Sequence, residues 1–372
     1  MGAVASIGLV VMLVGLVVVV GAMLAMTPWL MPRQECFAVT VPPVAHADPR
    51  IVAAKRAYTA IVVALTLVGA ACTVLGRYAL DEGAFMVVWT VVLGVLVLVP
   101  FLLMLVFRAR VRRIKREAGW KASSEVSAAV VVEGDLPAPV SLAWHLIDLV
   151  PIALTVVLFA LLWDRVPDLV PMHADLEGNI NGWSAKGPGV FLFPLLMQVF
   201  LTACFVGGHA VIGRSRRPVN PRAPMSSALS YALFARAMGW CLVAMGFVTD
   251  ALFLAFPLSS AGIITLGQAG ITVGVGILPP IVAFTIVALI YGQAGSRVLS
   301  GAPGDADDEM ACDDDDHWKL GIFYVNRDDP SWLVPERFGV GWTVNFGRPA
   351  AWVFLIGTLV FSGVIIALCM LL

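Results

Sequence analysis

The residues best suited to chemistry gather in one short stretch, PMHADLEGNINGWSAK, at residues 171–186. An imidazole beside carboxylates keeps its proton more readily than a free one, and an indole offers a flat apolar surface with one polar edge. Two obvious ligands are too few for a zinc site, so the stretch predicts a ligand-binding surface and no metal centre. The candidate ligand-binding residues are His173, Asp175, Gly178, Asn181, Trp183 and Lys186.

No catalytic motif accompanies this stretch. The sequence contains no HExxH pair, no GxSxG elbow and no phosphate-binding loop. It has no CxxC pair, and the acidic run at residues 305–316 lacks the spacing and the glycine of a calcium loop. We therefore predict no enzyme activity, no catalytic residue and no cofactor.

A second group of ionisable residues falls inside apolar segments, where each charged side chain costs about 3 kcal/mol or more. Asp148 and His145 lie one turn apart, and Arg236 and His209 are expected at a similar depth, near the cytoplasmic side. We expect Asp148 and Arg236 to form a buried intramembrane pair, with a proton relay or ligand site as the alternative. Asp250 lies further along the same segment as Arg236 and is predicted near the outer face.

The composition indicates which elements must position these residues. The chain has 372 residues, of which 60% are hydrophobic and 13% charged, and its mean hydropathy is +0.91. Soluble domains are roughly a quarter charged, so lipid is the expected solvent. Apolar runs of about 20 residues cross a bilayer. Eight such spans are predicted, at residues 3–26, 58–76, 84–107, 143–163, 190–212, 228–256, 267–292 and 351–371.

The Lys and Arg residues between the spans predict the orientation. Alternate connections hold four, seven, four and five of them, whereas the intervening ones hold one, two and none. Cytoplasmic loops carry an excess of Lys and Arg, so this 20-to-3 split places both termini and residues 164–189 outside. No cysteine lies in an outer connection, so no disulfide is predicted.

The cytoplasmic region 293–350 has two parts. Its acidic run, 305–316, is expected to be a solvated, mobile linker because like charges repel. Residues 317–349 are rich in β-branched and aromatic residues, which favours a small β-containing module. The fold class is therefore an all-α polytopic membrane protein with this module before the last helix. The predicted regions are a three-helix unit (1–116), a linker (117–142), a membrane domain (143–292) containing the outer loop, the cytoplasmic region, and the last helix (351–372).

The span at 267–292 has the features of a kinked or broken helix. Gly270 and Gly274 form a GxxxG pattern that favours close helix packing. Pro279 and Pro280 fall in mid-span and are expected to kink or break the helix. A kinked packing helix is the favoured interpretation, and a broken helix that lines a transport site is the alternative.

The outer loop also carries a family resemblance. PDLVPMHADLEGNINGWSAKG resembles the signature of a bacterial membrane domain of unknown function, the N-terminal domain of SdpI-type immunity proteins. Ala174 stands where that signature has an aromatic residue. The likeness covers roughly residues 143–212, and residues 313–349 resemble a second uncharacterised module found in the same proteins. The matching positions are Pro171, His173, Asp175, Gly178, Asn181, Gly182, Trp183 and Lys186.

The resemblance implies self-immunity to a secreted peptide toxin and a part in signalling, although no clear copy of the family's C-terminal immunity module follows. We therefore expect a multi-pass plasma-membrane protein for immunity or envelope sensing. Its outer loop would meet a secreted peptide or envelope component, and its inner module would recruit a cytoplasmic regulator. A secondary transporter and a non-catalytic assembly partner are the alternatives. The lipid bilayer is an expected partner, whereas nucleic acid is not, because no reading helix follows the basic run RARVRRIKRE.

Overall fold

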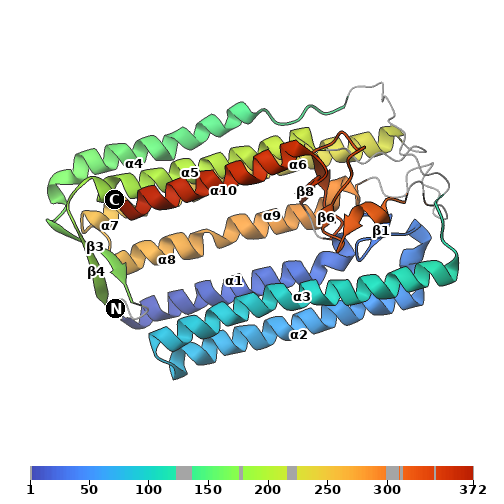
Figure 1. The fold of residues 1–372 in the computed structure, drawn as a ribbon. Helices are drawn as coiled ribbons and strands as arrows, with labels where there is room; N and C mark the ends of the chain where they lie inside the picture. The colour runs from blue at the N-terminus through green and yellow to red at the C-terminus, as the bar shows by residue number, and fades with distance from the viewer. Residues whose placement is uncertain are drawn as a thin grey trace.

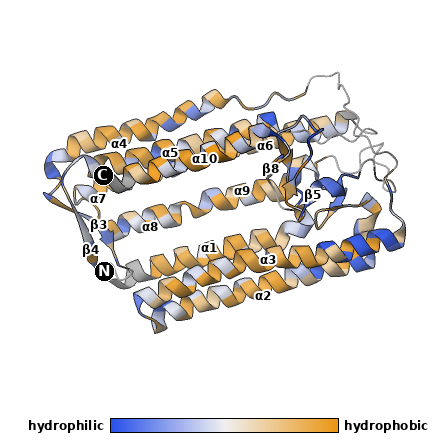
Figure 2. Ribbon diagram, in the orientation of Figure 1, coloured by the Kyte–Doolittle hydropathy of each residue, from blue (hydrophilic) through white to orange (hydrophobic). Residues whose placement is uncertain are grey.

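A bundle of long helices forms the body of the protein (Figure 1). The computed structural model describes residues 2–122, 136–175, 179–215, 224–298, 310, 313–338 and 341–371. Within these residues, eight helical segments are long and apolar enough to cross a membrane. Apolar residues cover the length of the helices, and most polar residues lie toward their ends (Figure 2). The predicted all-α class with eight spans is confirmed.

Ten α-helices in the described residues build these spans, and two spans contain two helices each. Helices α6 and α7 share one span, and α8 and α9 share another. The helices are α1 Gly2–Leu30, α2 Pro49–Ala79, α3 Glu82–Ala118, α4 Leu149–Leu162, α5 Pro188–Arg214, α6 Pro224–Leu252, α7 Ala255–Ser260, α8 Leu266–Gly276, α9 Leu278–Tyr291 and α10 Pro349–Leu371.

Local capping signals make α2 and α3 longer than their predicted spans. The Asp48 side chain accepts a hydrogen bond from the Arg50 amide, and Pro49 fits the first helical position, where no backbone donor is needed. The Asp81 side chain caps α3 in the same way. At its other end α3 continues through the basic run until Gly119, whose φ of 70° is the left-handed conformation that ends many helices.

The helices form two groups joined through α8 and α9. Helices α1, α2 and α3 pack on one another, and α4, α5, α6 and α10 form the second group (Figure 1). Helices α8 and α9 contact both α1 and α6. A Cβ atom at Gly274 would collide with the Met12 side chain, whereas one at Gly270 would meet nothing. The close approach predicted from the GxxxG pattern is therefore made by Gly274 alone.

The span at 267–292 contains two helices without an unwound segment between them, in line with the favoured interpretation of a kinked packing helix. Helices α8 and α9 meet at Ile277, whose φ of −75° and ψ of −21° remain helical. Pro279 and Pro280 lie in the first turn of α9, where a missing amide donor costs little. The backbone therefore stays helical where the alternative interpretation places an unwound segment.

Short strands lie at both ends of the bundle. The hairpin of β3 and β4 lies at the same end as the two chain termini, and β1, β6 and β8 lie at the opposite end (Figure 1). A small β-containing module therefore precedes the last helix, as predicted. In the described residues the strands form four two-stranded sheets: β1 Glu35–Cys36 with β2 Val39–Thr40, β3 Leu169–Ala174 with β4 Ile180–Ala185, β5 Trp318–Lys319 with β6 Phe323–Tyr324, and β7 Leu333–Pro335 with β8 Trp342–Val344.

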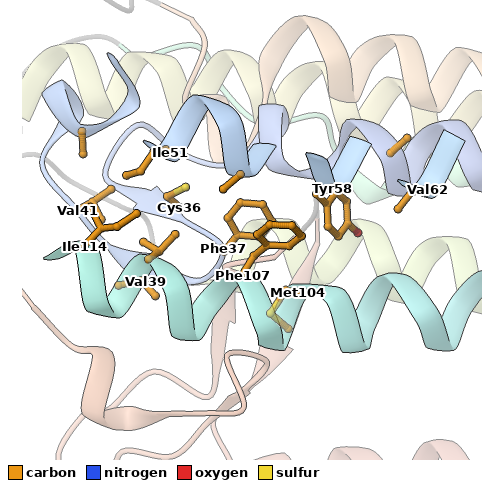
Figure 3. Close-up of a cluster of buried hydrophobic side chains, with 14 residues drawn as sticks. Cys36, Phe37, Val39, Val41, Ile51, Tyr58, Val62, Met104, Phe107 and Ile114 are labelled. Carbon is orange, nitrogen blue, oxygen red and sulfur yellow. The ribbon is translucent and has the colours of Figure 1, made fainter. Parts of the chain in front are cut away.

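An aromatic cluster anchors the β1–β2 hairpin against the three-helix group (Figure 3). Phe37 at the hairpin tip is fully buried, and its ring centroid lies 5.6 Å from that of Tyr58 and 5.2 Å from that of Phe107. The ring centroid of Phe338, in the C-terminal module, lies 6.5 Å from the ring centroid of Phe37. Phe37 and Ala38 have φ values of 47° and 57°, a conformation that costs non-glycine residues about 1–2 kcal/mol each. Burial of the Phe37 ring offsets that cost.

Ion pairs attach the C-terminal module to the same three-helix group. Lys115 on α3 contacts Asp313 at 2.7 Å and Asp315 at 2.8 Å. The buried guanidinium of Arg337 pairs with Asp314 and Asp315. The prediction of a solvated linker is wrong for residues 313–315, because cations from two other segments neutralise them. Residues 301–309, 311 and 312 lie outside the described part of the chain.

Candidate functional site

The predicted outer loop is a β-hairpin. Strands β3 and β4 run antiparallel, with Val170 opposite Ser184 and Pro171 opposite Trp183. Val170 is buried against Phe159 on α4 and Val190 on α5, so the base of the hairpin is seated between these two helices. The pairing shifts register around His173. Such irregularities re-aim side chains and are common near binding sites.

Asp175 and Asn179 close the hairpin. The Asp175 carboxylate accepts hydrogen bonds from the Asn179 backbone amide at 2.7 Å and from its side-chain amide at 2.9 Å. The Asp175 amide in turn donates to the Asn179 carbonyl at 2.9 Å. Asp175 therefore shapes the turn, in the manner typical of aspartate at such positions. Gly178, one of the candidate ligand-binding residues, lies outside the described residues together with 176 and 177.

His173 does not pair with a carboxylate as expected. Its Nδ1 atom makes a short hydrogen bond with the Asn181 side-chain oxygen across the hairpin. Gly182 is the strand partner of His173, and a Cβ atom there would lie 2.7 Å from the His173 Cβ. A glycine at this position therefore makes room for the histidine. The structure brings His173, Asn181 and Gly182 together at the register shift.

Lys186 attaches the hairpin to the end of α4. Its ammonium donates to the carbonyls of Trp163 at 2.7 Å and Val166 at 2.9 Å, and it lies 5.1 Å from the centre of the Trp163 ring. These contacts occupy the cation, and the Trp163–Arg165 turn (η3) follows α4 directly. The geometry gives Lys186 a positioning role at the base of the hairpin.

The hairpin presents apolar side chains to its surroundings. Trp183 is 57% exposed, and Leu169, Met172 and Ile180 are exposed as well. Among the described residues the sheet has only two strands, so the outer edge of each strand makes no hydrogen bonds to a further strand. An exposed strand edge beside apolar side chains can add a further strand from an extended peptide.

The expected ion pair between Asp148 and Arg236 is not formed. The Asp148 carboxylate binds His145 Nδ1 at 2.9 Å, and Arg236 donates to the Ala138 carbonyl at 3.1 Å. Asp148 is fully buried, whereas the guanidinium contact of Arg236 is exposed. The sequence suggested this pair because both residues lie near the same end of their spans. In the structure, Asp148 instead forms a hydrogen bond with the nearer imidazole of His145.

Buried polar residues lie between helices α4, α5 and α6 and are called the polar chain below. His145, in the Leu142–Asp148 turn (η2) before α4, also contacts His209 Nδ1 on α5 through its Nε2 atom at 3.2 Å. The Asp148 carboxylate lies against Gly246, where an added Cβ atom would be 3.1 Å away. Asp250 follows Gly246 by one helical turn on α6. The polar residues His145, Asp148, His209 and Asp250 all lie within the predicted spans.

Asp250 lies among the helices and not near the outer loop, contrary to the sequence-based expectation. It is fully buried, and its carboxylate accepts a hydrogen bond from Thr202 at 2.7 Å. Gln198 donates to the Asp250 carbonyl at 2.9 Å and to Thr155 at 3.0 Å. Sequence reasoning missed Gln198 and Thr202 because single uncharged polar residues within a span give no distinct signal.

Several oxygens along this chain lack a hydrogen-bond partner among the described residues. These atoms are Asp148 Oδ1, Asp250 Oδ1 and Gln198 Oε1. Buried polar atoms are nearly always satisfied, so unpaired acceptors on adjacent side chains indicate a place for a proton, a cation or water. Among the described residues, no group of three or more His, Cys, Asp or Glu side chains has the geometry of a metal site.

Comparisons with known families match the hairpin and the C-terminal module. Residues 151–197 match a domain of unknown function (DUF1648), and residues 327–352 match a family of unknown function (DUF5808). The first segment contains most of α4, the hairpin and the start of α5, and the second contains β7, β8 and the start of α10. Neither match identifies the chain as an SdpI-type immunity protein. No curated protein and no solved structure is significantly similar to the chain.

Proposed function

We propose that this multi-pass membrane protein is a bacterial immunity or envelope-sensing protein of the plasma membrane, which recognises a peptide through the β3–β4 hairpin. The observation that carries the proposal is the exposed Trp183 on a hairpin whose sheet has two strands among the described residues. Lys186 and the buried Val170 hold that hairpin to two membrane helices. The Lys and Arg distribution supports an outward-facing hairpin.

The chemistry of the hairpin favours an extended, amphipathic ligand with positive charge. Apolar side chains would pack beside Trp183, and a strand edge would supply backbone hydrogen bonds. The carboxylates of Asp164, Asp168 and Asp175 lie in or beside the hairpin and outnumber the one neighbouring guanidinium, Arg165, whereas the Lys186 ammonium is held by two carbonyls. The local surface is thus complementary to Lys- or Arg-containing peptides.

A binding experiment on the full chain tests this proposal. The probe is a fluorescein-labelled synthetic peptide of alternating Leu and Lys, titrated against the protein in phosphatidylcholine nanodiscs, with empty nanodiscs as the background. Trp183→Ala should weaken binding about 30-fold, because exposed aromatic anchors contribute about 2 kcal/mol or more. Trp144→Ala is the matched control, since Trp144 is also exposed but precedes α4, at its other end. Equal affinity in all three proteins would exclude recognition by the hairpin.

A phenotypic arm separates binding from immunity. Cells that express the native chain, Trp183→Ala or His173→Ala are exposed to secreted peptide toxins, and membrane insertion is checked by surface labelling. Loss of protection in inserted variants supports the immunity function. Full protection by both variants would leave the hairpin as a connector only.

A second candidate, coupled transport, is favoured by the polar chain in α4, α5 and α6. We infer that Asp148 and Asp250 exchange a proton or small cation, because both are buried and both retain an unpaired oxygen. The test uses proteoliposomes that enclose a pH-sensitive dye. Acidification after an external acid pulse should be faster than in empty liposomes and should fall in Asp148→Asn and Asp250→Asn. Asp164→Asn, at the outer turn, is the control; rates equal to those of empty liposomes would rule out proton transport.

A further inference from the structure

A cavity of about 290 Å³ lies between the end of α1, the start of α2 and the turn after α9. It is at the end of the bundle that carries β1, β6 and β8, opposite the β3–β4 hairpin. None of its residues belongs to the hairpin or to the polar chain in α4, α5 and α6. The polar and aromatic residues that line it are Trp29, Arg33, His46, Lys55, Ser296 and Arg297.

The cavity wall is cationic. Arg33, Lys55 and Arg297 contribute three positive side chains, and no Asp or Glu is among the described residues that line it. At the same end of the molecule, by contrast, Lys115 is matched by the carboxylates of Asp313 and Asp315. The cavity therefore concentrates positive charge without a counter-charge of its own.

Lys55 is the least expected of these residues, because only 6% of its surface is exposed. Its ammonium contacts His46 Nδ1 at 2.7 Å and lies 5.3 Å from the centre of the Trp29 ring. His46 Nε2 contacts the Arg33 carbonyl at 2.8 Å. Both neighbours orient the ammonium, but neither carries a negative charge. A buried charge without an opposite charge costs several kcal/mol in general.

The electrostatics of His46 agree with this arrangement. Burial first, and then the positive charge of Lys55, lower the pKa of His46 to about 4. The imidazole is therefore neutral at physiological pH, and its Nδ1 can accept a hydrogen bond from the ammonium. The Nε2 atom donates to the Arg33 carbonyl in that tautomer. The histidine thus fixes the position of Lys55 without neutralising it.

The opposite wall of the cavity is also held in place. Arg297 donates to the carbonyls of Leu289 at 2.5 Å and Trp29 at 2.8 Å, which links the turn after α9 to the end of α1. The buried Ser296 hydroxyl beside it has no hydrogen-bond partner among the described residues. Because two carbonyls hold the Arg297 guanidinium, the donors that remain for phosphate oxygens are the Ser296 hydroxyl, the Arg33 guanidinium and the Lys55 ammonium.

We propose that this cavity binds a phosphate group, either in the headgroup of an anionic phospholipid or in a soluble phosphate compound. The oxygens of the phosphate accept hydrogen bonds from Lys55, Arg33 and Ser296, and its charge compensates the cations. Trp29 lies at the end of an apolar span, the level at which lipid headgroups and interfacial tryptophans meet. The site is independent of the hairpin and of the function proposed for it.

The experiment uses the full chain and two probes that distinguish the sources. In the first arm, the protein is released from nanodiscs of mixed phosphatidylcholine and phosphatidylglycerol, and native mass spectrometry counts the retained lipids. In the second arm, inorganic phosphate is titrated calorimetrically into the protein in phosphatidylcholine nanodiscs. Arg33→Gln and Lys55→Met test the site. Arg56→Gln is the matched control, because it removes an exposed cation from the same end of α2.

We expect the native protein and Arg56→Gln to bind one probe saturably and alike. Arg33→Gln should bind it about tenfold more weakly, and Lys55→Met more weakly still. Arg33 is exposed, so its replacement leaves the fold intact even if Lys55→Met does not. Selective retention of phosphatidylglycerol assigns a lipid, and saturable phosphate binding assigns a soluble compound. No saturable binding of either probe, or equal loss in Arg56→Gln, would overturn the proposal.

Discussion

Replacing Arg337 by methionine should release the C-terminal module from the three-helix group. The Arg337 side chain is 3% exposed, and its partners Asp314 and Asp315 are 24% and 12% exposed. The guanidinium also donates to the Thr40 hydroxyl at 2.9 Å. Removing one member of a buried ion pair costs about 3–5 kcal/mol because the other charge stays buried. Asp315 keeps its contact with Lys115 at 2.8 Å, so the lower value, about 3 kcal/mol, is expected.

Hydrogen exchange measures this loss locally. About 3 kcal/mol corresponds to an opening equilibrium on the order of a hundredfold larger. The amides to follow are those of Val325 and Phe346, which donate to His317 and Tyr324 within the module. Arg337→Met should therefore raise their exchange rates on the order of a hundredfold.

A matched exposed pair provides the control for this prediction. Arg50 contacts Glu117 at 3.1 Å, but the two side chains are 46% and 53% exposed. Such pairs contribute at most about 1 kcal/mol, so Arg50→Met should change exchange in the module little. Unchanged protection in Arg337→Met, or an equal effect of Arg50→Met, would refute the reasoning from burial.

Three further predictions concern the anchors and the packing. Lys186→Met should speed amide exchange in β3 and β4 about tenfold, because it loses two charge-assisted hydrogen bonds, whereas Arg165→Met should not. Burial raises the pKa of Glu336 to about 7, so the folded state holds that proton more tightly than the unfolded state. Protection of β7 and β8 should then fall as pH rises from about 4.5 to about 7, by at most about 3 kcal/mol, and Glu336→Gln should remove the slope; a slope that persists contradicts this. Gly274→Leu should lower resistance to unfolding in dodecyl sulfate by about 1–3 kcal/mol through collision with Met12, and Gly270→Leu should be tolerated.

The membrane architecture could be predicted because its determinants are local. Hydrophobic length alone locates eight spans, and the Lys and Arg counts alternate between their connections. The C-terminal β-containing module could also be predicted, since β-branched and aromatic runs separated by turn residues have a local signature. The starts of α2 and α3 depend on Asp48 and Asp81, whose capping signals lie outside the apolar runs.

The side-chain partners could not be predicted, because they depend on how helices are rotated and shifted against one another. Asp148 pairs with His145 and lies against Gly246, an arrangement that depth along each span does not determine. The pairing of Lys115 with Asp313 and Asp315 joins residues that are 198 and 200 positions apart in the chain. The cavity around Lys55 is likewise formed by three distant segments. Sequence periodicity and short motifs do not predict such contacts between side chains of distant segments.

The central claim is that the β3–β4 hairpin faces the outside while the C-terminal module and the cationic cavity face the cytoplasm. Thiol labelling in intact cells tests it most directly, in a background from which the six native cysteines have been removed. A membrane-impermeant maleimide should label Ala185→Cys on β4 from outside. It should label Asp328→Cys, at an exposed position of the module, only after the cells are permeabilised. Labelling of Asp328→Cys in intact cells, with Ala185→Cys protected, would contradict the orientation and with it the proposed role of the hairpin.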